Sequence, residues 1–185
     1  MNHVPRLTCE HAALAVIDMQ EAFRLVIPDY AEVAGRIAKA VQGALLLDVP
    51  VIVTEQYPRG LRHTAEEIQH CLPPDYKVIE KICFNACDAE EFVTQLIARN
   101  IKKVMVCGIE AHICVAMTSL DLLSRGYEVY LLDDCITSRR QESKEVTLAR
   151  LTQAGAVLSN LEMALFEMMR TADIPQFKAL QNLIK

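Results

Sequence analysis

Residues 104–117 read Val-Met-Val-Cys-Gly-Ile-Glu-Ala-His-Ile-Cys-Val-Ala-Met and form the most informative stretch of the chain. It starts as a short apolar run that ends at Gly108, and after a turn Cys114 opens a segment with helical spacing. A buried strand that turns directly into a helix is typical of a parallel α/β sheet. The first helical side chain then faces the crevice at the carboxyl edge of the sheet, where such folds bind ligands. The stretch therefore predicts Cys114 in a ligand-binding crevice.

Two interpretations of Cys114 stay open on this stretch alone. The free N–H groups and positive dipole end of a helix favour the thiolate, which would make Cys114 a nucleophile on a sharp strand-to-helix turn. Alternatively, Cys114 is a small buried core residue, because free cysteines are usually inert.

The rest of the chain alternates apolar runs with helical patterns, as expected of a parallel sheet covered on both faces. The pattern predicts strands at 13–17, 49–54, 76–79, 103–107, 128–132 and 156–159. It predicts helices at 30–47, 88–99, 112–124, 141–153 and 161–171, and an amphipathic segment after Pro175. Asp88 is expected to cap the helix at 88–99, with Glu91 in the capping-box position. The fold class is therefore α/β, a doubly wound six-stranded parallel sheet with helices on both faces, in one domain over residues 1–185.

Composition narrows the function. The chain has 185 residues, 52% hydrophobic and 23% charged, as in soluble globular proteins. No apolar run approaches the ~20 residues of a membrane span, and residues 1–10 lack a signal-peptide core, so we expect a cytoplasmic protein without a membrane partner. The net charge of −5 disfavours nucleic acid as a partner and fits a small neutral or weakly charged substrate.

Seven cysteines, an odd number without a CxxC pair, favour reduced thiols over a disulfide framework. Their spacing does not suit zinc, so we expect neither a metal nor a cofactor. Two further residues follow predicted strands. Asp18 follows the first strand, either as a site carboxylate or as a cap, and Lys81 follows the third, where alone it would be a solvated lysine.

Taken in order, these places resemble the isochorismatase-like cysteine hydrolases along nearly the whole chain. The motifs that carry the resemblance are Ile-Asp-Met-Gln at 17–20, Lys-Ile-Cys-Phe at 81–84, Gly-Ile-Glu-Ala-His-Ile-Cys-Val at 108–115 and Asp-Asp-Cys-Ile-Thr-Ser-Arg at 133–139. The stretches 54–58 and 175–178 look like the isochorismatase-domain-containing branch of that family.

The resemblance implies a catalytic triad of Asp18, Lys81 and Cys114. The thiolate would attack a carbonyl carbon, Asp18 would take the thiol proton and return it to the leaving group, and Lys81 would keep Asp18 ionised. It also implies a cis bond between Ile109 and Glu110, which would aim the N–H groups of Glu110 and Cys114 as an oxyanion hole. Gln20, Phe23, Tyr57 and Phe84 are expected to line the substrate pocket, with plain core packing as the alternative for the aromatic residues.

Departures from the family pattern exclude two substrates. Family nicotinamidases carry an Asp-x-His metal motif after strand two, where this chain has Thr-Glu-Gln-Tyr at 54–57, so metal-dependent nicotinamidase activity is disfavoured. Ala111 stands where the family often has Thr, and Asn85 and Cys87 replace the common Ser and Phe after the lysine. The substrate wall therefore differs from that of isochorismatases, and isochorismate is not expected as the substrate.

The leading hypothesis is a metal-independent cysteine hydrolase that cleaves an amide or related C–N bond of a small molecule through a thioester-type intermediate. A catalytically idle relative that binds metabolites or proteins, and a redox-sensing thiol protein, are the alternatives. We also expect a homo-oligomer, by resemblance and because the segment after Pro175 offers an amphipathic face.

Overall fold

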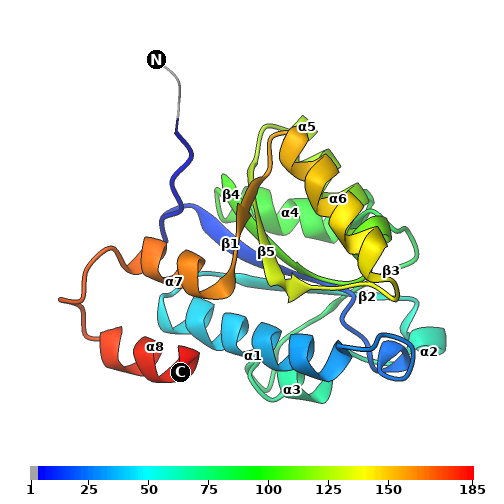
Figure 1. Cartoon of the computed structure of the whole chain (residues 1–185), viewed down its shortest axis with the longest axis horizontal. Coiled ribbons are helices and arrows are strands. Elements are labelled where there is room, and N and C mark those ends of the chain that lie inside the picture. Colours follow the sequence, from blue (N-terminus) through cyan, green and yellow to red (C-terminus); the bar gives the residue numbers. More distant parts are fainter. Residues whose placement is uncertain (1–3) are drawn as a thin grey trace.

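The computed structural model describes residues 4–185 and contains a six-stranded parallel sheet with the strand order β3-β2-β1-β4-β5-β6 (Figure 1). The strands are β1 (Ala12–Ile17), β2 (Val51–Gln56), β3 (Ile79–Lys81), β4 (Lys103–Gly108), β5 (Glu128–Ile136) and β6 (Val157–Ser159). The predicted fold class is confirmed. From β1 the chain adds β2 and β3 on one side of the sheet, and it then adds β4, β5 and β6 on the other side. In such a fold the ligand crevice lies at the carboxyl ends of the two strands where the order switches, here β1 and β4. A single domain was predicted over residues 1–185, and the structure describes residues 4–185 of this range.

Helices cover both faces of the sheet (Figure 1). The α-helices are α1 (Tyr30–Leu46), α2 (Pro58–Leu61), α3 (Glu66–Gln69), α4 (Glu90–Ala98), α5 (Ala116–Ser124), α6 (Gln141–Gln153), α7 (Leu161–Met169) and α8 (Phe177–Ile184). Two 3₁₀ turns, η1 (Glu21–Phe23) and η2 (Ala86–Asp88), and one π-helical turn, η3 (Ala111–Val115), complete the elements. One apolar core lies between the sheet and α1, α7 and α8, and the other lies between the sheet and α4, α5 and α6. Every residue of β1 is buried because both faces of this strand are covered.

Strand register brings the candidate site together. Ile17, the last residue of β1, is paired with Thr54 of β2 on one side and with Gly108 of β4 on the other. Gln56 of β2 is paired with Lys81 of β3. Because parallel strands end at the same edge, Asp18, Lys81 and the turn after Gly108 all lie at this edge.

The third strand differs from its prediction, since it covers 79–81 rather than 76–79. The hydroxyl of Tyr76 accepts a hydrogen bond from the Val53 N–H at 2.9 Å and donates one to the Val51 carbonyl at 2.9 Å. The Tyr76 side chain therefore takes the backbone groups of β2 that a strand over 76–79 would have paired with. As a result, β3 pairs with β2 only from Thr54 onward.

The predicted cap at Asp88 is wrong. Asp88 ends the 3₁₀ turn η2, and α4 begins at Glu90 without a side-chain cap. The chain is capped five residues before α4, where the Asn85 side chain accepts a hydrogen bond from the Cys87 N–H at 3.0 Å. Asn is as good a cap as Asp, and here the preceding turn uses it.

The fifth strand continues to Ile136, beyond the predicted end at residue 132. Asp133 and Asp134 follow the predicted end of the strand. In the structure, however, Asp134 accepts a hydrogen bond from the Leu161 N–H at 2.9 Å, so its carboxylate has a partner at the start of α7. The residues of the Asp-to-Arg motif therefore begin inside β5.

The apolar face of the amphipathic C-terminal segment packs against other parts of the same chain. Leu180 of α8 is fully buried, and Phe177 and Ile184 pack against the core that α1 also covers. The apolar face that suggested an oligomer contact is thus used against α1. Within residues 4–185, no helix is both long and apolar enough to span a membrane.

Candidate active site

A tight turn after β4 delivers Cys114 to the site. Gly108 has φ +113°, and a Cβ there would lie 2.0 Å from the Ile17 carbonyl oxygen, so only glycine fits between the strands. The chain then makes a π-helical turn, in which the Val115 N–H bonds to the Glu110 carbonyl at 3.3 Å. The predicted helix over 112–124 is therefore a π turn followed by α5, and Cys114 lies in the π turn.

Asp18 and Lys81 form a buried ion pair. Lys81 Nζ lies 2.6 Å from Asp18 Oδ2, and the exposed fractions of the two side chains are 0% and 3%. The Thr54 hydroxyl donates to Asp18 Oδ1 at 2.7 Å, and the Asp18 N–H donates to the same hydroxyl at 3.3 Å. Both carboxylate oxygens thus have partners, as a buried charge requires. Lys81 is buried, in contrast to the solvated lysine expected from its local sequence.

Cys114 lies against this pair as a protonated thiol. Burial raises the pKa of Cys114 to about 12, and the negative charge of Asp18 raises it further than the charge of Lys81 lowers it. The thiol and the Asp18 carboxylate line the same cavity. Burial and Asp18 thus favour the thiol over the thiolate that a helix terminus alone would favour. The geometry instead suits proton transfer to Asp18 as the sulfur attacks.

The loop before Cys114 is held from both sides. The Ile109–Glu110 peptide bond is cis in the structure. The Ile109 N–H donates to the Ile17 carbonyl at 2.9 Å, and the Ala111 N–H donates to the Thr137 carbonyl at 2.9 Å. The oxyanion hole assigned to the N–H groups of Glu110 and Cys114 stays a prediction.

The Glu110 side chain pairs with Arg139. Glu110 Oε2 accepts hydrogen bonds from Arg139 Nε at 3.0 Å and from the Arg139 N–H at 3.1 Å. Glu110 is buried, whereas the Arg139 side chain is 54% exposed. The carboxylate beside the predicted oxyanion loop is thereby neutralised, and the basic residue of the fourth motif is used by the protein itself.

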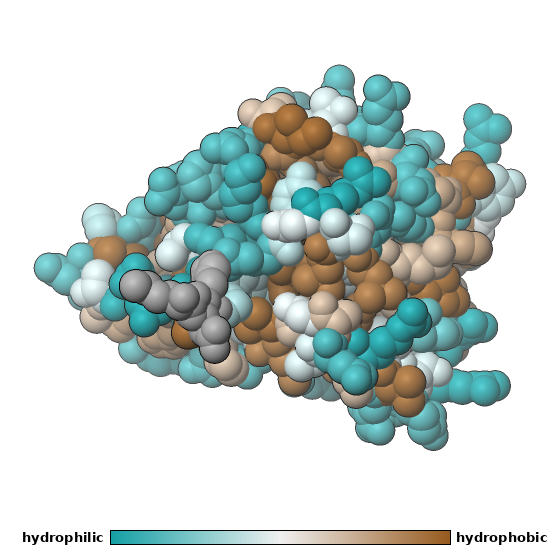
Figure 2. Space-filling view, turned by 90° about the horizontal axis from the view of Figure 1, so that it is seen from above, coloured by the Kyte–Doolittle hydropathy of each residue, from teal (hydrophilic) through white to brown (hydrophobic). Residues whose placement is uncertain are grey.

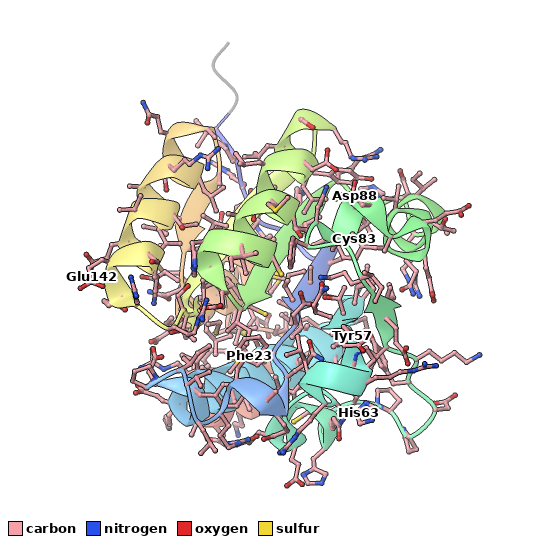
Figure 3. All side chains as sticks on the ribbon, turned by 90° about the vertical axis from the view of Figure 1, so that its right-hand side faces the viewer. Phe23, Tyr57, His63, Cys83, Asp88 and Glu142 are labelled. Atoms are coloured by element: carbon pink, nitrogen blue, oxygen red, sulfur yellow. The ribbon has the colours of Figure 1, made fainter. Side chains whose placement is uncertain are left out.

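A cavity of about 80 Å³ lies over the Cys114 thiol. Its described lining residues are Asp18, Phe23, Gln56, Leu61, Phe84, Ile109, Glu110, Ile113 and Cys114. Figure 3 looks onto this edge of the sheet, where Phe23 lies near the centre and Tyr57 and His63 lie toward α2. Of the four predicted pocket residues, Phe23 and Phe84 line the cavity and Gln20 and Tyr57 do not. Substrate contact by the two phenylalanines stays a prediction.

Gln20 has a different position from the one predicted for it. Its buried side chain donates to the Gln56 carbonyl at 3.0 Å and to the Arg62 carbonyl at 2.7 Å, and accepts from the Gln56 N–H at 2.8 Å. It therefore joins the two ends of the segment 57–61, which carries Leu61 into the cavity wall. The prediction that Gln20 lines the pocket is therefore corrected, because its amide bonds to the backbone and has no free group directed at a substrate.

Sequence reasoning missed Gln56, Leu61, Ile109 and Ile113 as lining residues. The position of Gln56 at the end of β2, in the same edge as Asp18, was a usable signal. Leu61 gave none, because its place depends on the two left-handed residues Tyr57 and Arg62 that turn the segment back.

The stretch 54–57, where family nicotinamidases carry their metal motif, lies mostly inside β2, which extends to Gln56. Glu55 is buried and accepts hydrogen bonds from the Thr64 N–H at 2.6 Å and the Thr64 hydroxyl at 2.7 Å, with His63 Nδ1 at 3.2 Å. In the described part of the chain, no group of three or more His, Cys, Asp or Glu side chains is arranged to hold a metal ion. All seven cysteines are free.

The fold is that of the isochorismatase-like hydrolase family. Residues 12–163 match the model of the isochorismatase domain family, and the chain belongs to that family. It is 37% identical over 181 residues to isochorismatase domain-containing protein 2A of Mus musculus, with 97% of this chain and 85% of that protein covered. The predicted family membership is confirmed.

Two solved structures are also similar. The MAR1 ribonuclease from Caenorhabditis elegans has a TM-score of 0.91 and 33% identity, with 97% of this chain and 92% of that chain covered. YcaC from Pseudomonas aeruginosa, solved with hexane-2,5-diol and covalent acrylamide, has a TM-score of 0.87 and 25% identity, with 100% and 98% covered.

Proposed function

We propose that this protein is a metal-independent cysteine hydrolase that cleaves an amide or related C–N bond of a small molecule. The observation that carries the proposal is the buried Cys114 thiol in the same cavity lining as Asp18, which is itself paired with Lys81 at 2.6 Å. A nucleophile, a base beside it and a third group that orients the base are the parts that covalent catalysis needs.

The reaction follows from these positions. Cys114 Sγ bonds to the carbonyl carbon while its proton passes to Asp18, and the carbonyl oxygen takes the negative charge. The intermediate then collapses, the C–N bond breaks, and the proton on Asp18 passes to the departing nitrogen. Water attacks the resulting thioester, releases the acid and restores the thiol. Lys81 stabilises the carboxylate form of Asp18 at the start and end of this cycle.

Small molecules suit the cavity better than RNA. The C. elegans relative is named a ribonuclease, but phosphate recognition needs cationic groups. The ionisable residues among the described lining are Asp18, Glu110 and Cys114.

The redox-sensing alternative has weaker support. Oxidation proceeds through the thiolate. Burial raises the pKa of Cys114 to about 12 and that of Cys87 to about 12, so both stay protonated at neutral pH. An idle relative would bind a ligand in the same cavity without turnover, and the experiment below separates it from an enzyme.

Trapping the intermediate tests the proposal. Hydroxylamine competes with water for a thioester, so a turned-over amide should yield hydroxamate together with ammonia. Cys114→Ser should lower both products by at least ~10³-fold, because the sulfur nucleophile is lost. Cys71→Ser, at a half-buried cysteine on another part of the surface, is the matched control and should keep full activity. Equal turnover by Cys114→Ser would refute the mechanism.

We also propose that the protein is a cytoplasmic homo-oligomer. Figure 2 shows the α5 and α6 side, where apolar surface emerges between polar side chains. Met117 and Val146, on these helices, are 45% and 70% exposed. Burial of such side chains favours association of two copies. Sedimentation as a monomer at micromolar concentration would contradict this.

A further inference from the structure

We infer that the substrate is a compact, uncharged carboxamide whose acyl group is smaller than an aromatic ring. This inference rests on the proposed function, since it describes what the cavity over Cys114 admits. Three features of the cavity carry it: its size, its charges and the state of its hydrogen-bonding groups.

Size limits the acyl group. The cavity of about 80 Å³ has roughly half the volume of the ~150 Å³ cavity that holds one benzene molecule in an apolar protein core. Phe23, Leu61, Phe84, Ile109 and Ile113 form its apolar lining. An acyl chain of a few carbons fits this space, and a six-membered ring does not.

Charge excludes anionic substrates. Asp18 and Glu110 both line the cavity as carboxylates, each balanced by a basic partner. The ammonium of Lys81 has four oxygen partners, namely Asp18, Gln56 and the carbonyls of Cys83 and Phe84, so its three hydrogens are fully used. A substrate carboxylate would therefore be buried beside two carboxylates, with no cation among the described lining residues, which is strongly unfavourable.

The remaining polar side chain is partly occupied. The Gln56 side-chain oxygen accepts from Lys81 Nζ at 2.9 Å, and one hydrogen of its nitrogen is donated to the Ile82 carbonyl at 2.6 Å. The amide therefore keeps one hydrogen that can contact a substrate. The other uncharged lining residues besides Cys114 are Phe23, Leu61, Phe84, Ile109 and Ile113, so the cavity favours an apolar body attached directly to the reacting carbonyl.

Competing alkylation measures this selectivity without a known substrate. Iodoacetamide is small and neutral, iodoacetate has the same size but carries a charge, and 2-iodo-N-phenylacetamide carries a ring. Rates at Cys114 are read by peptide mass spectrometry and divided by the rates of glutathione with the same reagents. We expect iodoacetamide to exceed each of the other two by at least about tenfold in this normalised rate. Normalised rates equal within twofold would overturn the inference.

Matched variants assign the selectivity to the cavity wall. Phe84→Ala removes a lining ring and should raise the normalised rate of the phenyl reagent at least about fivefold relative to iodoacetamide, with the discrimination against iodoacetate kept. Phe166→Ala removes a similarly exposed ring on α7, outside the lining, and should change neither ratio. If both variants respond alike, the cavity wall is not the selective element and the inference fails.

Ammonia release separates this inference from the proposed function. The wild-type protein is assayed with propionamide, succinamate and benzamide, and we expect release from propionamide alone. Faster release from succinamate or benzamide would overturn the inference and leave the hydrolase in place. Release from none of the three, with the alkylation selectivity intact, would count against the hydrolase and leave the description of the cavity standing.

Discussion

Lys81 Nζ lies 2.6 Å from Asp18 Oδ2, and the two side chains come from the ends of strands that are not neighbours in the sheet. β2 lies between β1 and β3, and the long Lys81 side chain reaches past its end to the carboxylate. Both groups are almost fully buried, so the pair is scarcely screened by solvent. The relationship connects the proposed catalysis with stability, because Asp18, the proposed base, is also a buried charge with a single cationic partner in the described chain.

Loss of one partner should destabilise the fold. Lys81→Met removes the ammonium and leaves the Asp18 carboxylate buried beside the Thr54 hydroxyl and a thiol. We expect the free energy of unfolding to fall by about 3–5 kcal/mol. Urea denaturation followed by circular dichroism measures this loss.

The double variant is the control for that loss. Asp18→Asn in the Lys81→Met background removes the orphaned charge and should restore more than half of the lost stability, because neutral groups replace both ions. Activity should stay absent in both variants. A double variant no more stable than Lys81→Met would show that the two charges are not coupled.

Alkaline pH should test the buried thiol. The pKa of Cys114 is raised from 9.0 to about 12, chiefly by burial and secondly by Asp18. We expect its alkylation rate to keep rising between pH 9 and 10.5, whereas an ordinary thiol levels off there. In Asp18→Asn the second cause is removed, so the rate should level off at lower pH although turnover is lost. A wild-type plateau near pH 9 would contradict the buried thiol beside a carboxylate.

The raised pKa of Cys114 also determines the direction in which the stability of the fold changes with pH. The folded chain holds the Cys114 proton more tightly than the unfolded chain does. Its contribution to stability is therefore complete below pH 9 and is lost as the pH rises toward 12. The midpoint of urea unfolding should accordingly fall with pH over this window, and fall less in Cys114→Ala.

The parts of the site that lie at strand ends could be predicted from the sequence, and the parts set by tertiary contacts could not. Asp18 and Lys81 follow apolar runs, and parallel strands end at one edge, so their meeting follows from the fold class. Local sequence shows the helix terminus beside Cys114, but it does not show the burial that raises the pKa of this thiol. Leu61 was missed because a turn of two left-handed residues brings it to the cavity, and this turn depends on Gln20.

Gly108→Ala should abolish folding or cost more than about 4 kcal/mol. The added Cβ would meet the Ile17 carbonyl at 2.0 Å, and the left-handed φ of +113° adds strain. Gly35→Ala is the matched control in the middle of α1, where a Cβ meets nothing within 4 Å. It should leave stability unchanged or raise it by up to about 1 kcal/mol. Thermal unfolding of both variants makes the comparison, and a mild effect at Gly108 would contradict the close approach of β4 to β1.

Gln20→Met should loosen the segment 57–61 that closes the cavity. The change keeps side-chain volume but removes the hydrogen bonds to the Gln56 backbone and the Arg62 carbonyl. Buried backbone groups left without partners cost roughly 1–3 kcal/mol each, and the cost falls on the segment they anchor. Hydrogen exchange over residues 57–64 should speed up at least about tenfold, because local opening becomes easier.

The control for this change is Gln69→Met on the exposed side of α3, which should leave exchange in the segment unchanged. Because Gln20 acts through the wall that Leu61 forms, Gln20→Met should raise KM for a small amide more than it lowers kcat, whereas loss of Asp18 lowers kcat. A substrate-binding amide predicts a different result, in which KM rises and hydrogen exchange of the segment stays as in the wild type. The two measurements together therefore decide whether Gln20 binds substrate or positions the cavity wall.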